Sequence, residues 1–238
     1  MILFLKILLA HILGDFVFQP EKWVKDKEKK KLKSPKLYLH LGVHLVLLLL
    51  ILQFDLHYWK AILFIIITHF SIDVSKLYLQ HKNNKKWLFF IDQVLHILML
   101  FIALNFYNSI DYTFEEQTIK QLLIIAICVL FLVFASSIII KMIITQWNPY
   151  KDKEGDKSLA KAGRFIGILE RLFIFVFMIT NHWEAIGFLL AAKSVFRFGD
   201  LTSSKDRKLT EYILIGTLLS FGISILTGLF YQFMLNFL

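Results

Sequence analysis

The sequence has very little cysteine and no long polar stretch that could form a soluble domain. Its single cysteine, Cys128, lies in the apolar run LLIIAICVLFLVF, so an internal disulfide is excluded. Any chemistry must therefore come from apolar helices and the short loops between them. The sequence also lacks GxSxG, P-loop and CxxC motifs, so no motif supports a serine hydrolase, a nucleoside triphosphatase or a thiol-redox protein.

Apolar residues dominate what is present. They make up 57% of the 238 residues, and the mean hydropathy is +0.63. Apolar runs of roughly 20 residues recur, and a run of that length crosses a bilayer core of about 30 Å. The composition thus indicates an integral membrane protein. The first run resembles a signal peptide, but no small-x-small cleavage site follows it, so we expect residues 2–19 to be retained as a helix.

The predicted fold is all-α, a polytopic membrane helical bundle of about eight transmembrane helices. We expect a single membrane domain over 1–238, with one four-helix half at 1–106 and a second at 107–238. No sequence repeat relates the halves. The expected spans are 2–19, 37–55, 58–79, 87–106, 119–146, 163–181, 183–199 and 209–237.

The positive charge indicates orientation in a membrane, not nucleic-acid binding. The net charge is +9, and most lysines lie in short loops; the loop 20–36 holds eight of them. Lysine-rich loops stay in the cytoplasm, beside anionic lipid headgroups. With 20–36 inside, the lysine-rich loops 81–87, 151–161 and 203–208 also fall inside, and the acidic loop 108–117 falls outside. Both termini are then expected outside.

Four pairs of ionisable residues occur in the first four spans with the spacing i, i+4, which places both members on one helix face. They are His11 with Asp15, His40 with His44, His69 with Asp73, and Asp92 with His96. The predicted topology puts every pair in the cytoplasmic half of the bilayer, roughly 5–15 Å from its surface at about 1.5 Å per residue. A lone His–Asp pair is usually an inter-helix hydrogen bond. Four pairs at one depth predict a shared functional site instead.

Imidazole and carboxylate ligands together suit Zn, Fe or Mn. A divalent metal would also neutralise three buried aspartates that otherwise repel one another. Eight donors exceed one tetrahedral shell, so we expect either two ions or one ion with a second layer of partners. Lys76 and Gln93 lie beside the pairs and are placed to assist.

Charged residues also mark the cytoplasmic ends of the later spans. The segment GRFIGILER contains a GxxxG, Gly163 and Gly167, whose simplest role is close helix packing. One interpretation of the charges is a structural network in which Glu170 or Glu211 pairs with a cation. The other is that an anionic substrate is bound by cations beside the metal. The cations considered are Arg164, Arg171, Lys193 and Arg197.

The ordered motifs resemble a family of bacterial membrane proteins, domain of unknown function 3307. The resemblance rests on HILGDFVFQ, HxxxH, THFSIDVSK and DQVLH, followed by GRFIGILER, AAKSVFRF and EYILIGTLLS, and so extends over nearly the whole chain. It implies no activity. A looser similarity to inner-membrane metal-dependent hydrolases implies a bacterial inner membrane location and favours hydrolysis.

The leading hypothesis is a membrane-embedded metal-dependent hydrolase acting near the cytoplasmic face on an anionic, phosphorylated lipid or small substrate, with Asp92 and Asp15 as catalytic candidates. Three alternatives stay open: a metal or proton transporter, a haem-binding electron-transfer protein, and a membrane sensor or interaction subunit with a structural metal. Purely apolar outer halves such as LLLLIL weigh against transport, and the many aspartates weigh against haem. The sequence does not identify a protein partner.

Overall fold

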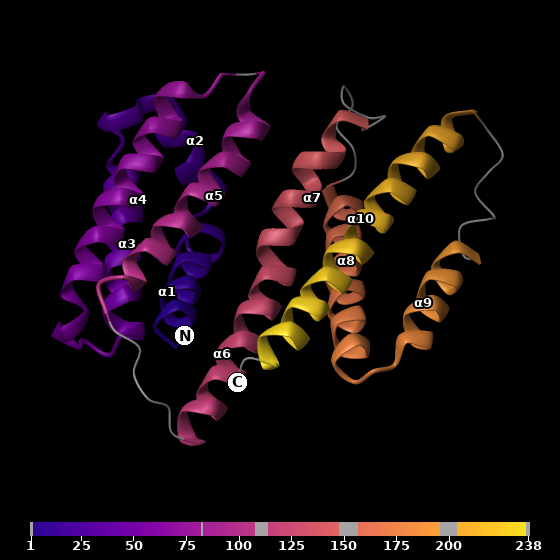
Figure 1. Cartoon of the computed structure of the whole chain (residues 1–238). Helices are drawn as coiled ribbons and strands as arrows, with labels where there is room; N and C mark the ends of the chain where they lie inside the picture. The colour runs from indigo at the N-terminus through magenta and orange to yellow at the C-terminus, as the bar shows by residue number, and fades with distance from the viewer. Residues whose placement is uncertain (1, 82, 108–113, 148–156, 196–203, 237–238) are drawn as a thin grey trace. The chain divides into compact units, whose positions relative to one another are not determined.

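The structure is a computed structural model that describes residues 2–81, 83–107, 114–147, 157–195 and 204–236, and these residues are all-helical with no strand among them. The chain divides into two compact units, 1–127 and 128–238 (Figure 1). Some of the predicted loops and sites lie outside the described residues. They are most of loop 108–117, most of loop 151–161, and residues 82, 197 and 203.

Besides the first part of α6 (Phe114–Leu130), the first unit contains four helices that pack lengthwise and one short helix at their end (Figure 1). The lengthwise helices are α1 (Ile2–Ile12), α3 (Pro35–Ile51), α4 (Trp59–Leu79) and α5 (Lys85–Leu104). A π-helical turn, η1 (Leu13–Val17), extends α1, and the chain then bends by 83°. Residues 20–36 were expected to be a loop, but they form α2 (Glu21–Lys30) and the 3₁₀ turn η2 (Lys31–Lys33). Pro20 begins this helix, because proline is compatible with a helix start and not with a continuation of η1.

The apolar core of the first unit lies at one end of these helices, the end at which α1 begins. It joins Ile7 and Ala10 of α1 to Leu48 of α3, Ile65 of α4 and Leu100 of α5. Each residue belongs to the inward-facing stripe of its helix, where buried positions recur every three or four residues. This apolar core leaves the opposite ends of the same stripes for polar side chains.

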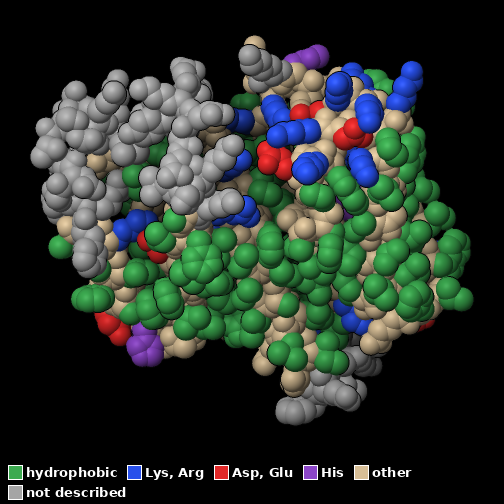
Figure 2. Space-filling model, turned by 180° about the vertical axis from the view of Figure 1, so that it is seen from behind, with side chains coloured by type: hydrophobic (Ala, Val, Ile, Leu, Met, Phe, Trp, Pro, Cys, Tyr) green, Lys and Arg blue, Asp and Glu red, His purple; other side chains and the backbone are tan. Residues whose placement is uncertain are grey.

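Four described helices are long and apolar enough to cross a bilayer, or five if α1 and α2 with their turns count as one bent span. The four are Leu56–Leu79, Lys85–Leu104, Gln117–Trp147 and Thr210–Leu235, in agreement with four of the predicted spans. Helix α3 is shorter, with 17 residues. Figure 2 shows charged side chains gathered at one end of the first unit, beside a broad hydrophobic surface. Large exposed residues such as Val46, Leu63 and Ile67 belong to that apolar exterior.

The second unit consists of the end of one long kinked helix and three more helices. The long helix comprises α6 (Phe114–Leu130), the π-turn η4 (Phe131–Ala135) and α7 (Ser136–Ile144), closed by η5 (Thr145–Trp147). The others are α8 (Lys157–Ile179), α9 (Trp183–Val195) and α10 (Ser204–Leu235).

Close helix packing in the second unit does not occur where the GxxxG predicted it. A Cβ on Gly163 would have no described atom within 4 Å apart from its own helix backbone, and one on Gly167 would meet only the Arg171 side chain of its own helix, at 3.4 Å. The close approach is instead at Gly228 of α10, where a Cβ would lie 2.7 Å from Met178 of α8. The packing face of α8 is thus the one that carries Ile174 and Met178, both fully buried.

Candidate metal centre

The structure brings all eight predicted His and Asp residues together inside the first unit. They occupy the same inward stripes as the core: His44 precedes Leu48 by one turn in α3, and His69 follows Ile65 by one turn in α4. In α5, His96 precedes Leu100 in the same way. Because the spacing is i, i+4, the buried polar side chains lie on the same helix faces as the apolar core, one turn further along.

The π-turn η1 delivers Asp15 to this cluster. Its wider winding is visible in the hydrogen bond from the Phe18 amide to the Leu13 carbonyl, at 2.9 Å. Gly14 lies in the turn, against the ring of His44, and a Cβ there would be 2.3 Å from His44 Cε1. Only glycine leaves room for the His44 ring in this position against η1. Turns of this kind are frequent at functional sites.

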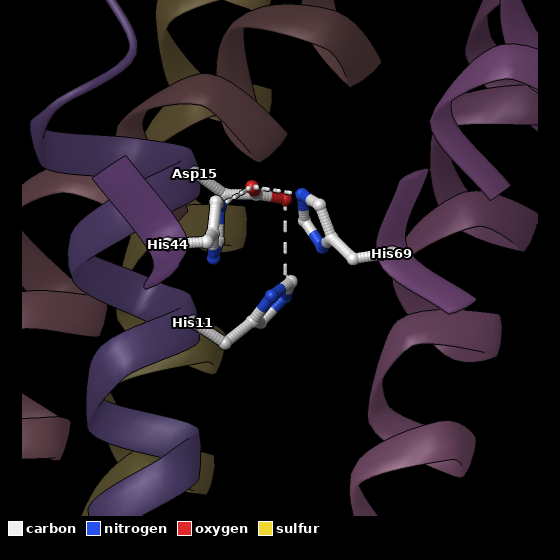
Figure 3. A group of neighbouring side chains, drawn as sticks. All are labelled: His11, Asp15, His44 and His69. Atoms are coloured by element: carbon white, nitrogen blue, oxygen red, sulfur yellow. Dashed lines mark hydrogen bonds and ion pairs between the residues drawn. The ribbon is translucent and has the colours of Figure 1, made fainter. Parts of the chain in front are cut away.

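Asp15 lies at the centre of a group of four residues, the Asp15 group (Figure 3). Its Oδ1 is 3.0 Å from His44 Nε2 and 3.7 Å from His69 Nε2, and its Oδ2 is 3.8 Å from His11 Nε2. One ligand atom from each of the four residues fits within 4.8 Å of the others. A tetrahedral shell with metal–ligand bonds near 2.1 Å has ligand atoms about 3.4 Å apart. The three distances to Asp15, 3.0–3.8 Å, are near this value, and the remaining separations are no larger than 4.8 Å.

Two further groups are linked to the first through shared residues: the second shares His69 with the first, and the third shares Asp73 with the second. His40, His69 and Asp73 form one, and Asp73, Asp92 and His96 form the other. His40 Nε2 lies 3.2 Å from His69 Nε2 and 3.3 Å from Asp15 Oδ1, so the groups are continuous. This arrangement provides up to eight ligands in one connected cluster.

Two lysines distinguish the later groups from the Asp15 group. The Lys27 ammonium donates to Asp73 Oδ2 at 2.8 Å, and the Lys76 ammonium donates to Asp92 Oδ2 at 2.7 Å. Asp15 has no described lysine partner and accepts from the Gln93 amide at 3.1 Å. Three carboxylates against two ammonium groups leave one negative charge in excess when the histidines are neutral. That excess is centred on Asp15.

Three buried atoms of the cluster have no hydrogen-bond partner among the described residues: His11 Nε2, Asp92 Oδ1 and His96 Nε2. A buried polar atom without a partner is costly, and it calls for a ligand that completes it. The residues could therefore hold a metal ion, with His11 Nε2, which lies 3.8 Å from Asp15 Oδ2, as one of its ligands. The same donor set suits Zn, Fe or Mn.

Sequence reasoning missed three contributors. Lys27 was expected beside lipid headgroups, but it is 5% exposed and ion-paired with Asp73, because α2 folds back toward the cluster. Its signal is the half-buried Trp23 and Val24, one turn earlier on the same face. Gln19, at the bend after η1, bonds the His40 ring at 2.8 Å. Gly14 had no signal at all, because nothing in the sequence indicates the approach of His44.

The residues predicted to bind an anionic substrate lie in the second unit, where three are described. The Arg171 guanidinium is buried and donates to the Leu132 carbonyl, to Ser137 and to Ser220. The carbonyl of Leu132 lies in the π-turn η4, which frees it from the regular helical ladder. These contacts stabilise the packing of α8 against η4, α7 and α10.

The other charged residues of the predicted anion site and of the alternative ion-pair network do not join Arg171 in these contacts. Lys193 donates to Glu170 at 2.7 Å, one of the pairings set out in the structural interpretation. Arg164 is exposed, as is Glu211. Arg197 lies outside the described residues. Substrate binding by these cations stays a prediction.

Comparison with known proteins supports one assignment. No curated protein and no solved structure matches the chain, so the looser similarity to inner-membrane hydrolases gains no support. The model of a family described as "Protein of unknown function (DUF3307)" matches residues 3–124. The motifs had suggested a resemblance over nearly the whole chain, but this match covers about half of it. The matched part contains all eight cluster residues. The chain belongs to the DUF3307 family.

Proposed function

We propose that this protein is a membrane-embedded metal-dependent hydrolase that acts near the cytoplasmic face on an anionic, phosphorylated substrate. The observation that carries the proposal is the Asp15 group, in which three imidazole nitrogens surround one carboxylate and His11 Nε2 has no partner among the described residues. A divalent ion there would satisfy the free nitrogen and turn the excess negative charge into an excess positive one. A positive centre favours an anionic substrate.

The first ion belongs at His11, Asp15, His44 and His69, because no lysine competes for this carboxylate. Zn, Fe and Mn all fit the ligand types. A second ion at Asp73 would have to displace the Lys27 ammonium. We therefore prefer a single ion, with the neighbouring carboxylates paired to lysines. A bound divalent ion supplies an activated water for hydrolysis.

Asp92 is the proposed general base. Its Oδ2 is held by Lys76, while Oδ1 is buried, lies 3.8 Å from His96 Nδ1 and has no described hydrogen-bond partner, so Oδ1 is available to accept a proton from water. In the hydrolysis of a phosphate monoester, water oxygen adds to phosphorus and the ester P–O bond breaks. The water proton passes to Asp92 and is returned to the leaving alcohol.

Transport receives less support from the packing of the first unit. A route across the membrane would have to continue beyond the cluster, but the next positions along the stripes are tightly packed apolar residues. Leu48, Ile65 and Leu100 are all at most 5% exposed. A metal site closed on that side favours chemistry at one face over passage through both.

We also propose the finer topology: a multi-pass protein of the bacterial inner membrane, with eight spans and both termini outside. Helix α3 is then a full crossing, because 17 residues at about 1.5 Å each reach about 25 Å, within the range of short spans. Its position between α1 and α4 requires it to cross if those two run in the same direction.

The metal is tested by elemental analysis of the purified protein. We expect about one equivalent of Zn, Fe or Mn in the wild type and a loss of at least 80% in Asp15→Asn and His44→Ala. His81→Ala is the matched control, because His81 is exposed and outside the cluster, and it should retain the wild-type content. Absence of metal from the wild type after reconstitution with each ion would refute the proposal.

Hydrolysis is tested on metal-loaded protein by release of inorganic phosphate from phosphatidic acid and from 4-nitrophenyl phosphate. We expect Asp92→Asn to retain metal and lose at least 100-fold in turnover, because general bases contribute about 10²–10⁴-fold. Metal-loaded wild type that releases no phosphate from either substrate would refute the hydrolase and leave a structural metal.

A further inference from the structure

An open groove runs between α4 and α5, beside the metal centre and on the surface of the first unit. Its volume is about 190 Å³. Most of its wall is apolar and includes Leu88, Ile91 and Leu95 of α5. Lys76 and Asp92 lie in the same wall, so the groove connects an apolar surface with two members of the buried cluster.

The polar part of the groove is suited to a negatively charged group. The Lys76 ammonium donates one hydrogen bond to Asp92 Oδ2 at 2.7 Å and has two further N–H donors, while its side chain is 23% exposed. The hydroxyl groups of Ser71 and Ser75 donate to carbonyls of their own helix and do not bring a competing carboxylate. Asp92 Oδ1 is buried and has no hydrogen-bond partner among the described residues.

The groove lies between two helices whose exteriors require an apolar environment. Both α4 and α5 qualify as membrane spans, and in each only 28% of the most apolar window is buried within the structure. In a bilayer, the outward surface of such helices is in contact with lipid chains. A groove in that surface opens to lipid, and its charged end lies at the same level as the cluster.

We propose that this groove binds one acyl chain of a bilayer phospholipid that carries a terminal phosphate, with the phosphate held at Lys76. The inference rests on the proposed function and narrows its substrate from anionic phosphorylated compounds in general to lipids that approach from within the membrane. Apolar walls select the chain, and the ammonium selects the phosphate. Asp92 then lies beside the group that is to be hydrolysed.

The test uses the full chain in detergent micelles with phosphatidic acid that carries a photoreactive diazirine in one acyl chain. After illumination, labelled peptides are identified by mass spectrometry. We expect the label on α4 and α5, and at least a fivefold decrease in Ile91→Trp, whose indole fills the groove. Val94→Trp is the matched control: Val94 is exposed on the same helix and does not line the groove, so labelling should be unchanged.

The headgroup is tested in the same assay with photoreactive diacylglycerol, which has the chains but no phosphate. We expect the wild type to be labelled at least fivefold more by phosphatidic acid, and Lys76→Gln to lose this preference while Lys76→Arg keeps it. Equal labelling in Ile91→Trp and Val94→Trp would overturn the groove. Full competition by inorganic phosphate would show a site for small soluble anions and would also overturn it.

Metal content is measured on the same samples, so the two proposals fail separately. Label in the groove of a metal-free protein would refute the hydrolase and leave lipid binding intact. Metal in a protein whose groove takes no label would leave the metal centre and refute the lipid substrate.

Discussion

At the residue scale, Gly14 and Lys27 support the His and Asp cluster without belonging to it. Gly14 removes the steric barrier between η1 and His44, and Lys27 neutralises Asp73 from a helix that carries no ligand. Gly14 makes room for a cluster residue, and Lys27 balances the charge of another. Substitutions at these two positions therefore report on the cluster itself.

Gly14→Ala should disrupt the centre, because the added methyl group would lie 2.3 Å from His44 Cε1. Overpacking of this kind costs about 1–3 kcal/mol. We expect a lower melting temperature and loss of bound metal, measured by thermal unfolding and elemental analysis. Gly42→Ala is the control, since a Cβ there meets nothing within 4 Å. Equal behaviour of the two variants would contradict the close approach.

Lys27→Met should destabilise the first unit more than Lys25→Met on the same helix. Removing one partner of a buried ion pair costs about 3–5 kcal/mol, because Asp73 is left as an uncompensated charge. Lys25 forms an exposed pair with Glu21, and such pairs contribute little. Thermal unfolding of both variants measures the difference. A melting temperature unchanged in Lys27→Met would show that Lys27 is not buried against Asp73.

At the scale of the element, α2 is held to the rest of the unit by a carboxylate as well as by Lys27. Glu28 accepts from Gln80 at the end of α4 and from Lys85 at the start of α5. Burial raises the pKa of Glu28, but hydrogen bonds from Lys85 and Gln80 outweigh it and lower the pKa below its ordinary value of 4.5. The ionised form therefore stabilises the folded position of α2.

A lowered pKa makes the contribution of Glu28 dependent on pH in one direction. The stabilisation is complete above pH 4.5 and is lost as the pH falls through the lower native value. We expect the melting temperature of the wild type to exceed that of Glu28→Gln at pH 7, and the difference to disappear in acid. Glu21→Gln, at an exposed position, should match the wild type at every pH. A constant difference between wild type and Glu28→Gln would contradict this account.

The sequence predicts the elements of the first unit well where spacing is regular. In α3, α4 and α5 the His and Asp pairs continue the apolar stripe at intervals of four, so their common buried face could be predicted. The π-turn η1 and the helix α2 could not. A π-turn changes the winding of the helix but has no characteristic amino-acid composition. Helix α2 has no apolar stripe to indicate it, because its one buried residue is Lys27.

At the scale of the whole molecule, the proposed orientation can be tested with single cysteines. In a Cys128→Ser background, Leu56→Cys lies in the exposed turn after α3, and Lys25→Cys lies on α2. We expect a membrane-impermeant maleimide to label Leu56→Cys in intact bacterial cells and Lys25→Cys only after lysis. Labelling of both in intact cells, or the reverse order, would contradict termini that lie outside.

Composition predicts the all-helical class and the apolar exterior, because both depend on sums over many residues. The number of spans is harder to predict, since α3 and α9 are short and α8 carries Arg164, Glu170 and Arg171. Length and hydropathy alone do not decide whether such helices cross. The predicted anion-binding residues show the same limit: Arg171 has a sequence context like that of a ligand, but its donors are taken by neighbouring helices.

The cluster draws its members from positions 11 to 96, and this spacing has a consequence for how the protein is made. A ribosome adds about 5–20 residues per second. Under the proposed topology, α1 enters the bilayer with Asp15 several seconds before Gln93 and Asp92 have been synthesised. During biosynthesis the nascent aspartate must be sheltered by the insertion machinery or carried as the neutral acid. The full cluster is therefore complete only after α5 has been synthesised, whereas the four ligands of the proposed ion site are all present once α4 has been made.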